Sequence, residues 1–304
     1  MGGWTARDIP DLTGRRAIVT GANSGIGYHT ALGLAQHGAS VVLACRGAER
    51  GQAAADRIRA AAPDADVALG LLDLADLSSV RTFAARHADT PLDLLVNNAG
   101  VMALPRRTTA DGFETQFGTN HLGHFALTGL LLPALRSAPS SRVVTLTSGF
   151  AWTGRLRFDD LQGERRYGKW TAYAQSKLAN LVFAKELDRR VPDLTSVAAH
   201  PGYASTNLQQ TGPRMRGSAF MEKVTGAGNV LIAQSAAAGA LSSLYAATAP
   251  HVQGGACYGP RLVQYRGAPV KVVTPPHAGR PGLGERLWEV SEDLTSVTYA
   301  PAPA

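Results

Sequence analysis

Cysteine is scarce in this sequence of 304 residues, which has only Cys45 and Cys257. Two cysteines so far apart cannot build a disulfide framework, so a secreted disulfide-rich scaffold is excluded and a reducing, cytoplasmic compartment is expected. No apolar run of roughly 18 residues or more occurs, so we expect no membrane span. The first residues, MGGWTARDIPDLTG, contain no basic stretch followed by an apolar one, so a secretory leader is not expected either.

Charged residues are also few, at 17% of the chain, and positive ones predominate. Thirty Lys and Arg against 23 Asp and Glu give a net charge of +7. The arginines are scattered and form no long basic run, so we expect no nucleic-acid partner. The positive balance fits better with the surface of an enzyme that attracts an anionic cofactor.

Hydrophobic residues make up 45% of the chain, which is enough to bury a large core and excludes general disorder. The 33 glycines and 17 prolines follow no regular period, so a collagen-like or low-complexity chain is excluded. No internal repeat and no linker-like stretch divides the sequence. We therefore expect residues 1–304 to form a single domain.

Short apolar segments alternate with longer segments of helical periodicity through most of the chain. The short segments are rich in Val, Ile and Leu and do not alternate apolar with polar residues, as is typical of strands in a parallel sheet covered on both faces. The expected strands span residues 15–20, 40–45, 66–72, 92–98, 141–147 and 194–200. The expected helices span residues 26–37, 47–61, 76–88, 111–137 and 171–191. This order predicts a doubly wound α/β fold of three layers, with a central parallel sheet of about seven strands.

After residue 200 this alternation becomes irregular. A Gly- and Ser-containing stretch at 202–228 precedes an Ala-rich helix expected near 230–248. A further short strand is expected around Cys257 and Tyr258.

A glycine-rich segment, TGANSGIG, directly follows the first expected strand and occupies residues 20–27. Glycines in such a turn let backbone N–H groups approach a pyrophosphate, and the following helix points its positive end at the same anion. The spacing, G-x-x-x-G-x-G, differs from the common G-x-G-x-x-G dinucleotide fingerprint. An ordinary glycine-rich turn is the alternative, but the strand before it and the helix after it favour dinucleotide binding.

The second expected strand ends in Ala44, Cys45 and Arg46. It has no carboxylate at this position, where dinucleotide-binding proteins usually contact the adenosine ribose. An acidic residue there would bind the 2′-hydroxyl of NAD(H). Arg46 instead offers a planar set of N–H donors that suits a 2′-phosphate, so NADP(H) is preferred over NAD(H). The alternative for Arg46 is an exposed arginine at the start of a helix.

Two further strand ends leave two interpretations open. Asp73 and Leu74 could contact an adenine, or Asp73 could cap the next helix. The segment NNAG at residues 97–100 suits a turn, but its small residues would also let a flat ring or a ribose lie against the backbone.

Tyr173 and Lys177 lie four residues apart in TAYAQSKLAN, within the helix expected at 171–191. Residues at this spacing share one helix face, so the phenol and the ammonium converge on one site. A phenol with an ordinary pKa of about 10 is a poor acid–base catalyst at neutral pH, and a neighbouring cation lowers that pKa by favouring the phenolate. The same spacing is common on solvated helix faces, so its meaning depends on the motifs that precede it.

These motifs occur in the order found in short-chain dehydrogenases/reductases, and the chain resembles that family from roughly residue 12 to residue 295. TGANSGIG is followed by NNAG, Asn120, Ser148, Tyr173 with Lys177, and HPGY at 200–203. Within the family the sequence is most similar to the retinol dehydrogenase and WW-domain oxidoreductase group. The similarity is carried by LACRGAERG, TNHLGHFALT, DDLQGERRY, YAQSKLANLVFAKEL and RLWEVS. The resemblance implies an NAD(P)-binding Rossmann fold.

The resemblance also implies catalytic roles. Tyr173 acts as general acid when a carbonyl is reduced and as general base when an alcohol is oxidised, while Lys177 lowers its pKa and binds the nicotinamide ribose. Ser148 polarises the substrate oxygen, and Asn120 supports a water that links Lys177 to solvent. Hydride passes between the nicotinamide and the carbonyl carbon.

The residues that the resemblance places at the cofactor lie at the strand ends and on the catalytic helix. They are Gly21, Asn23, Ser24, Gly25, Ile26, Gly27, Arg46, Asp73, Leu74, Asn97, Ala99, Gly100, Tyr173, Lys177, Pro201, Gly202 and Thr206. No metal site is expected.

Substrate contacts are expected from Phe150, Trp152 and Tyr203, with residues 203–228 as a lid region. These aromatic residues could instead only pack within the fold. The sequence therefore predicts an NADP(H)-dependent oxidoreductase that interconverts a carbonyl and an alcohol on a small hydrophobic molecule. The alternative is an NADP(H)-binding regulatory or scaffold protein without turnover.

The expected helices at 120–136 and 172–190 leave the oligomeric state open. Their apolar residues could form the contact face of a homodimer or homotetramer, as in many members of the family. The same residues could instead cover the sheet.

Overall fold

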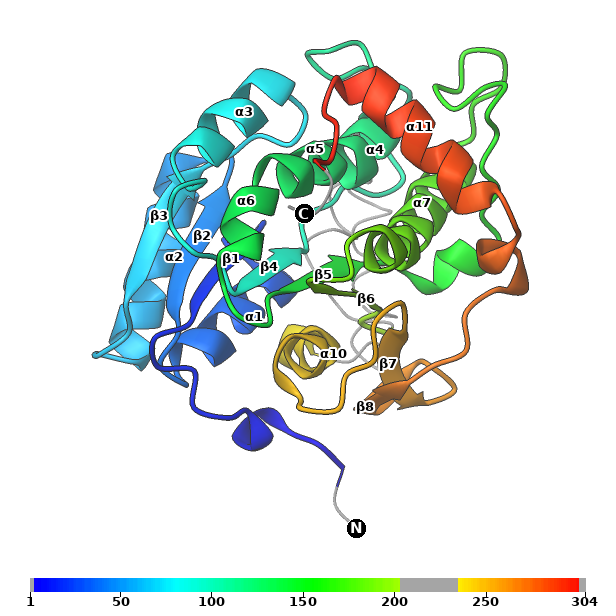
Figure 1. The fold of residues 1–304 in the computed structure, drawn as a ribbon. Coiled ribbons are helices and arrows are strands. Elements are labelled where there is room, and N and C mark those ends of the chain that lie inside the picture. The colour runs from blue at the N-terminus through cyan, green and yellow to red at the C-terminus, as the bar shows by residue number, and fades with distance from the viewer. Residues whose placement is uncertain (1–2, 203–234, 301–304) are drawn as a thin grey trace, which may run out of the picture.

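Eight strands form one sheet between two layers of helices in the computed structural model, which describes residues 3–202 and 235–300 (Figure 1). The strand order is β3-β2-β1-β4-β5-β6-β7-β8. Strands β1 to β7 run parallel, and β8 runs antiparallel to β7. This arrangement confirms the predicted doubly wound α/β fold of three layers.

The strands expected before residue 200 lie within one or two residues of the predicted ranges. The strands are β1 (Arg16–Thr20), β2 (Ser40–Cys45), β3 (Val67–Leu71), β4 (Leu94–Asn97), β5 (Arg142–Leu146), β6 (Thr195–Ala199), β7 (Cys257–Leu262) and β8 (Arg266–Lys271). The helices are α1 (Gly25–Ala35), α2 (Ala48–Ala61), α3 (Leu77–Ala85), α4 (Thr115–Phe117), α5 (Gly123–Leu130), α6 (Leu132–Arg136), α7 (Lys169–Arg190), α10 (Ala236–Thr248) and α11 (Leu283–Thr295).

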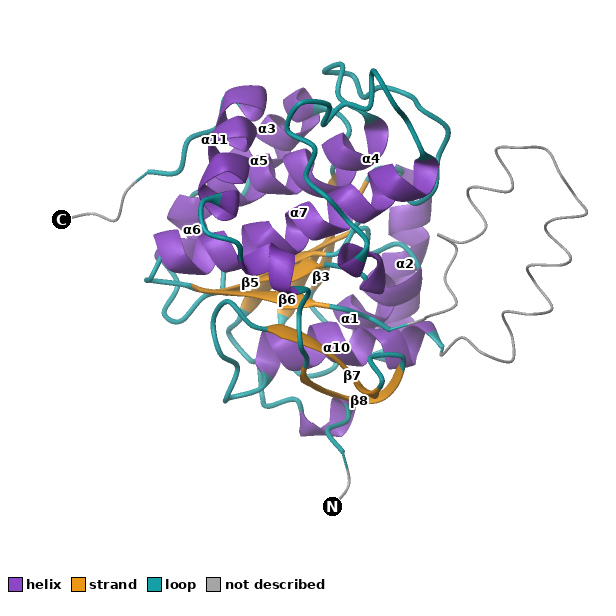
Figure 2. Ribbon diagram, turned by 90° about the vertical axis from the view of Figure 1, so that its right-hand side faces the viewer, coloured by secondary structure: helices purple, strands orange, loops and turns teal. Residues whose placement is uncertain are grey.

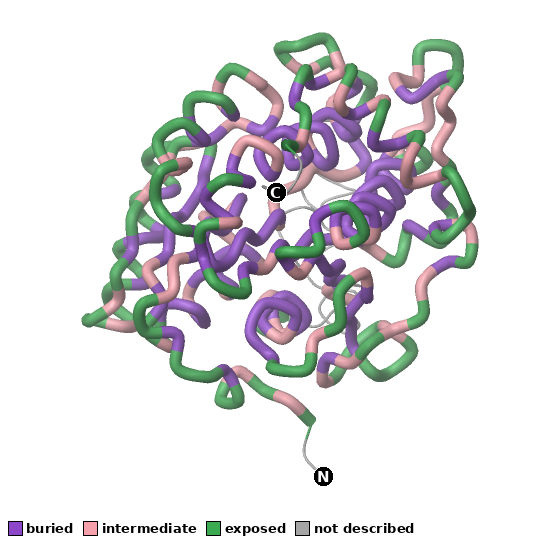
Figure 3. Tube along the Cα trace, viewed as in Figure 1, coloured by how far each residue is buried: buried purple, intermediate pink, exposed green. Residues whose placement is uncertain are grey.

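Helices α1, α2 and α10 cover one face of the sheet, and α3, α5, α6 and α7 cover the other, with α11 packed on α7 (Figures 1 and 2). Successive residues of a strand enter opposite cores, as in β1, where Ala17 and Val19 face α1 and Ile18 faces α5. The central strands are therefore buried on both faces (Figure 3), which explains why they lack polar alternation.

The segment expected as one helix over 111–137 is divided into several pieces. A π-helical turn at Gly118–Leu122 joins α4 to α5, and Leu131 (φ −91°, ψ 1°) separates α5 from α6. Pro133 lies at the start of α6, where its missing N–H is tolerated, whereas a continuous helix would require that donor. Regular apolar spacing alone did not indicate these breaks.

The sequence patterns did not predict β8 or α11. β8 is an edge strand that contains Gly267 and Pro269, both of which are unfavourable in a strand interior. Among the described residues β8 pairs with β7 alone, so one edge of the strand has no ladder to which Pro269 would have to donate.

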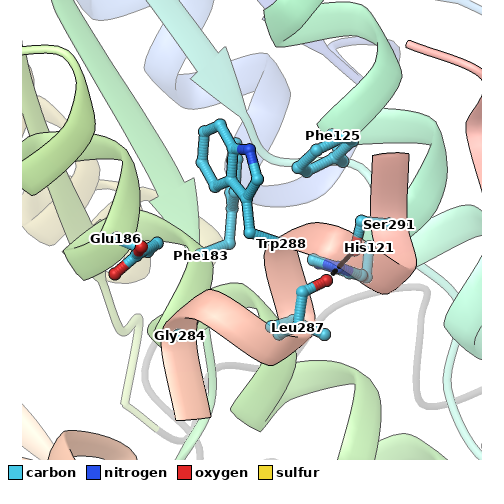
Figure 4. A pocket seen from close by; sticks show the side chains of 8 residues that line it. All are labelled: His121, Phe125, Phe183, Glu186, Gly284, Leu287, Trp288 and Ser291. Carbon is cyan, nitrogen blue, oxygen red and sulfur yellow. Dashed lines mark hydrogen bonds between the residues drawn. The ribbon is translucent and has the colours of Figure 1, made fainter. Parts of the chain in front are cut away.

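Helix α11 lies over α7 and over the π-helical turn (Figure 4). The Trp288 ring is buried, with its centroid 5.1 Å from that of Phe125 and 6.0 Å from that of Phe183. The hydroxyl of Tyr299 donates to the Phe125 carbonyl at 2.7 Å. The apolar residues of α5 and α7 thus contact both the sheet and the C-terminal segment of this same chain, while the oligomeric state stays a prediction.

The described residues do not test the expected single domain over 1–304 or the expected lid at 203–228. Both stay predictions, because residues 203–234 lie outside the part of the chain that the structure describes. Among the helices that it does describe, none combines the length and apolar character needed to cross a bilayer.

Trp288→Ala is expected to lower the free energy of unfolding by about 3–5 kcal/mol, because it leaves a cavity between α5, α7 and α11. Urea denaturation measures the change. Trp152→Ala is the matched control, since Trp152 is 44% exposed and should change stability by less than about 1 kcal/mol. Equal effects of the two substitutions would show that α11 does not stabilise the fold through Trp288.

Candidate active site

The predicted site residues lie where the parallel strands end. β1, β2, β4, β5 and β6 finish at the same edge of the sheet because they share one direction. The glycine-rich turn follows β1, Arg46 follows β2, residues 98–100 follow β4, Ser148 lies after β5, and Gly202 lies after β6. Segments far apart in sequence therefore meet at the edge where open α/β sheets bind ligands.

The glycine-rich turn between β1 and α1 brings the first N–H groups of α1 to the end of β1. Gly21 (φ 65°) and Gly25 (φ 58°) adopt left-handed conformations that other residues rarely take. Gly27 is packed so closely that a Cβ there would meet Asn98 Nδ2 and the Gly21 carbonyl. Ser24 at the N-cap of α1 makes no side-chain hydrogen bond to the helix, so the first N–H groups of α1 can bind an anion. Partly buried in the same turn are Asn23 and Ile26.

Arg46 is exposed directly after β2, beside this turn. The Gly21 amide donates to the Ala44 carbonyl at 2.8 Å, which fixes the turn against the end of β2. No hydrogen bond or ion pair engages the Arg46 guanidinium within the described ranges. Its N–H donors are therefore available to a phosphate group.

Asp73 does not cap α3. Its Oδ1 accepts a hydrogen bond from Ala75 N at 2.9 Å, whereas Asp76 caps the helix by accepting from Ser78 N at 2.8 Å. Leu74 is buried in the core beneath α3 and α5. Of the two interpretations of Asp73, helix capping is therefore wrong, and an adenine contact stays a prediction.

Thr20, the last residue of β1, joins the glycine-rich turn to the segment after β4. Its Oγ1 accepts hydrogen bonds from Asn98 N and Ala99 N, both at 2.9 Å, and its carbonyl accepts one from Asn98 Nδ2 at 2.7 Å. Asn97 is oriented differently, because its Nδ2 donates to Thr128 Oγ1 at 3.0 Å within the core. The Asn97 side chain is therefore unavailable to a cofactor, which leaves only its backbone for the predicted contact.

Asn120 is fully buried in the π-helical turn and binds two other segments. Its Oδ1 accepts from Val101 N at 2.7 Å, and its Nδ2 donates to Val101 O and to Ser176 Oγ, both at 2.9 Å. A Cβ on Gly100 would lie 3.1 Å from Asn120 Oδ1 and 3.5 Å from Lys177 Nζ. Asn120 thus holds the segment after β4 close to α7, and Gly100 leaves the space between them open.

His124, which the sequence motifs did not single out, links Asn120 to Thr20. Burial lowers the pKa of His124 to about 4, so its imidazole is neutral near pH 7. Its Nδ1 lies 2.9 Å from the Asn120 carbonyl, which can only accept, so Nδ1 carries the proton. Its Nε2, 2.9 Å from Thr20 Oγ1, then accepts the hydroxyl proton. The signal for this role in the sequence is a histidine within the apolar segment HLGHFALTGLLL.

Ser148, Tyr173 and Lys177 come together from β5 and α7. The Ser148 hydroxyl lies near enough to the Tyr173 phenol to lower the pKa of that phenol. Lys177 Nζ donates to the Leu146 carbonyl at 3.1 Å and lies 6.0 Å from the Tyr173 ring centroid. Thr147 Oγ1 donates to the Lys177 carbonyl at 2.7 Å, which attaches α7 to the end of β5. The three side chains therefore share one site beside the end of β5.

Burial determines the pKa values of Tyr173 and Lys177. It raises the pKa of Tyr173 to about 12, and the nearby Ser148 hydroxyl offsets part of that increase. It lowers the pKa of Lys177 to about 8. That Lys177 lowers the pKa of Tyr173 stays a prediction: in this structure burial raises that pKa by more than the nearby Ser148 hydroxyl lowers it.

The predicted substrate residues Phe150 and Trp152 lie on a short 3-10 turn after Ser148. Their side chains are 41% and 44% exposed. A small hollow opens beside Ser148, and Trp152, His200 and Val273 form part of its lining. Trp152 therefore lines this hollow, whereas Phe150 lies against Tyr173, with ring centroids 5.5 Å apart.

The segment after β6 is described only in part. Pro201 and Gly202 are partly buried, and Gly202 N donates to His200 Nδ1 at 3.2 Å. Tyr203, Thr206 and the predicted lid region lie outside the described residues.

The chain and its structure are similar to known proteins. The family described as short chain dehydrogenase matches residues 15–216. Retinol dehydrogenase 13 of Homo sapiens is 46% identical over 244 residues, which cover 78% of this chain and 73% of that protein. The crystal structure of an uncharacterized protein from Mycobacterium paratuberculosis is 42% identical, with a TM-score of 0.82, and the match covers 98% of this chain and 99% of that chain.

A more distant structure contains a cofactor. It comes from Beutenbergia cavernae, is described as an NAD(P) dependent gluconate 5-dehydrogenase, and has NADP bound at low occupancy. It is 26% identical to this chain, with a TM-score of 0.61, and the match covers 78% of this chain and 91% of that chain.

Lowering the pH from about 6.5 to about 4 is expected to decrease the free energy of unfolding. Burial lowers the pKa of His121 to about 3 and that of His124 to about 4, so the unfolded chain takes up protons that the folded chain does not. His124→Gln removes one of these groups and should reduce the slope by up to about 1.4 kcal/mol per pH unit. Urea denaturation at a series of pH values measures both slopes. Identical slopes would contradict a neutral, buried His124.

Proposed function

Because this chain belongs to the short chain dehydrogenase family, we propose that it interconverts a carbonyl and an alcohol on a small hydrophobic substrate by hydride transfer. That membership confirms the resemblance carried by the ordered motifs. The observation that carries the proposed activity is the meeting of Ser148, Tyr173 and Lys177 at the sheet edge where the glycine-rich turn also lies.

The residues at this edge fit a nicotinamide dinucleotide, and we propose NADP(H) in preference to NAD(H). The free amides at the start of α1 and the close packing of Gly27 suit a pyrophosphate, and exposed Arg46 suits a 2′-phosphate. The NADP in the related Beutenbergia cavernae structure supports the same choice. When bound, the nicotinamide supplies or accepts the hydride. Tyr173 and Lys177 would bind its ribose.

Tyr173 would exchange a proton with the substrate oxygen. With a pKa of about 12 the phenol is protonated near pH 7, which suits donation to the oxygen of a carbonyl undergoing reduction. Ser148, whose hydroxyl lies near the Tyr173 phenol, would hold the same oxygen. Alcohol oxidation requires the phenolate and is therefore favoured by higher pH.

Lys177 would return the proton to Tyr173. Its pKa of about 8 lets it gain and lose a proton near neutral pH. Asn120 would support the water that connects Lys177 to solvent, since its carbonyl has a second lone pair besides the one that His124 Nδ1 engages at 2.9 Å. Gly100 keeps the space between Asn120 and Lys177 free of side-chain atoms.

Tyr173→Phe is expected to lower kcat for NADPH-dependent aldehyde reduction by about 100-fold or more, because it removes the proton donor. NADPH affinity, measured separately by fluorescence titration, should change little. Tyr167→Phe is the matched control, because the Tyr167 hydroxyl donates to the Leu104 carbonyl and lies outside the site. Full activity of Tyr173→Phe would overturn the mechanism. Tight NADPH binding by the wild type without turnover of any carbonyl would overturn the proposed activity.

Arg46→Asp is expected to lower the ratio of kcat/KM with NADPH to kcat/KM with NADH by roughly 10- to 100-fold, through loss of charge-assisted hydrogen bonds to the 2′-phosphate. Steady-state kinetics with both cofactors gives the ratio. Arg86→Asp changes the net charge equally at an exposed position after α3 and should leave the ratio unchanged. An unchanged ratio in Arg46→Asp would remove the reason for preferring NADP(H).

A further inference from the structure

A row of three aromatic rings leads outward from Tyr173. The Phe150 centroid lies 5.5 Å from that of Tyr173, with an interplanar angle of 69°. The Trp170 centroid lies 5.2 Å from that of Phe150 on a nearly parallel plane, at 12°. The exposed fraction of the residue increases from 5% at Tyr173 to 41% at Phe150 and 44% at Trp170. The row therefore runs from the buried phenol to solvent.

The positions of these rings follow from the two elements that build the site. Trp170 and Tyr173 are three residues apart near the start of α7, so they share a helix face. Phe150 is the second residue after Ser148, and its amide donates to Ser148 Oγ at 3.3 Å. The position of Phe150 is thus set by Ser148, and that of Trp170 by Tyr173.

Packing alone does not account for this arrangement. Phe150 and Trp170 are stacked on one another, yet these residues are 41% and 44% exposed. Single exposed hydrophobic residues are common on protein surfaces, whereas two stacked rings that continue a row from the proposed proton donor form a continuous apolar strip. Such a strip suits the apolar part of a molecule whose oxygen lies at Tyr173.

We propose that Phe150 and Trp170 form a subsite for a planar aromatic ring attached to the reacting carbonyl, so that the substrates are aryl aldehydes and aryl ketones. This inference rests on the proposed function. Trp170, which the sequence motifs did not indicate, is its specificity-determining residue. Ring-to-ring contacts add an attraction that a saturated ring of similar size lacks, which corresponds to a preference of about 3- to 10-fold.

The test uses benzaldehyde and cyclohexanecarbaldehyde, which share ring size and differ in planarity. The measured quantity is the ratio of their kcat/KM values with NADPH, so that any general loss of activity cancels. Trp170→Leu keeps an apolar side chain without a ring and should lower the aryl-to-alkyl ratio by about 3- to 10-fold. Trp170→Phe keeps a ring and should stay within about twofold of the wild type. Both substitutions are at an exposed position and are compatible with folding.

Three results would overturn the subsite. The first is an unchanged ratio in Trp170→Leu, and the second is an equal loss in Trp170→Phe and Trp170→Leu. The third is an equal loss in Trp152→Leu, which would place selectivity in the hollow beside Ser148 rather than on the row.

A binding measurement separates this inference from the proposed activity. Saturation-transfer NMR with benzyl alcohol and cyclohexylmethanol, on the NADP-saturated protein, needs no turnover. Ring-selective binding that Trp170→Leu abolishes would support the subsite even if neither aldehyde were reduced, in which case the proposed activity fails and the subsite stands. Equal binding of the two alcohols by the wild type would overturn the subsite.

Discussion

The ammonium of Lys177 is buried, and within the described residues one backbone carbonyl, that of Leu146, receives it at 3.1 Å. A buried charge is costly unless it is well paired, so the end of β5 must stay within hydrogen-bonding distance of the Lys177 ammonium on α7. The hydrogen bond from Thr147 Oγ1 to the Lys177 carbonyl holds α7 against the end of β5. The same burial lowers the pKa of Lys177 and raises that of Tyr173, which leaves the phenol protonated and the ammonium close to its titration point at neutral pH.

A second set of hydrogen bonds connects this site to the glycine-rich turn. The Thr20 hydroxyl accepts hydrogen bonds from two backbone amides of the segment after β4. Neutral His124 hydrogen-bonds both the Thr20 hydroxyl and the Asn120 carbonyl. Asn120 in turn holds Val101 and Ser176. The turn proposed to bind the cofactor phosphates and the helix that carries Tyr173 are therefore linked by a continuous set of hydrogen bonds.

Sequence patterns predict the parts of this structure in which local chemistry and tertiary context agree. Strands buried on both faces have uninterrupted apolar sequences, so the bounds of β1 to β6 could be predicted to within one or two residues. Glycine occupies positions 21 and 25 because the backbone there has a positive φ. The orientation of Asn97 toward Thr128 could not be predicted, because it depends on a helix packed against the sheet. The pKa values of Tyr173 and Lys177 depend on burial, which spacing along a helix does not report.

Isotope transfer tests the central claim, hydride transfer between the nicotinamide and a carbonyl carbon, most directly. The protein is incubated with benzaldehyde and NADPH that carries deuterium at the transferable position of the nicotinamide, and the benzyl alcohol is analysed by mass spectrometry. The account predicts one deuterium on the carbinol carbon of each alcohol molecule, with the hydroxyl proton drawn from solvent through Tyr173. Absence of the alcohol, or alcohol without deuterium at that carbon, would contradict it.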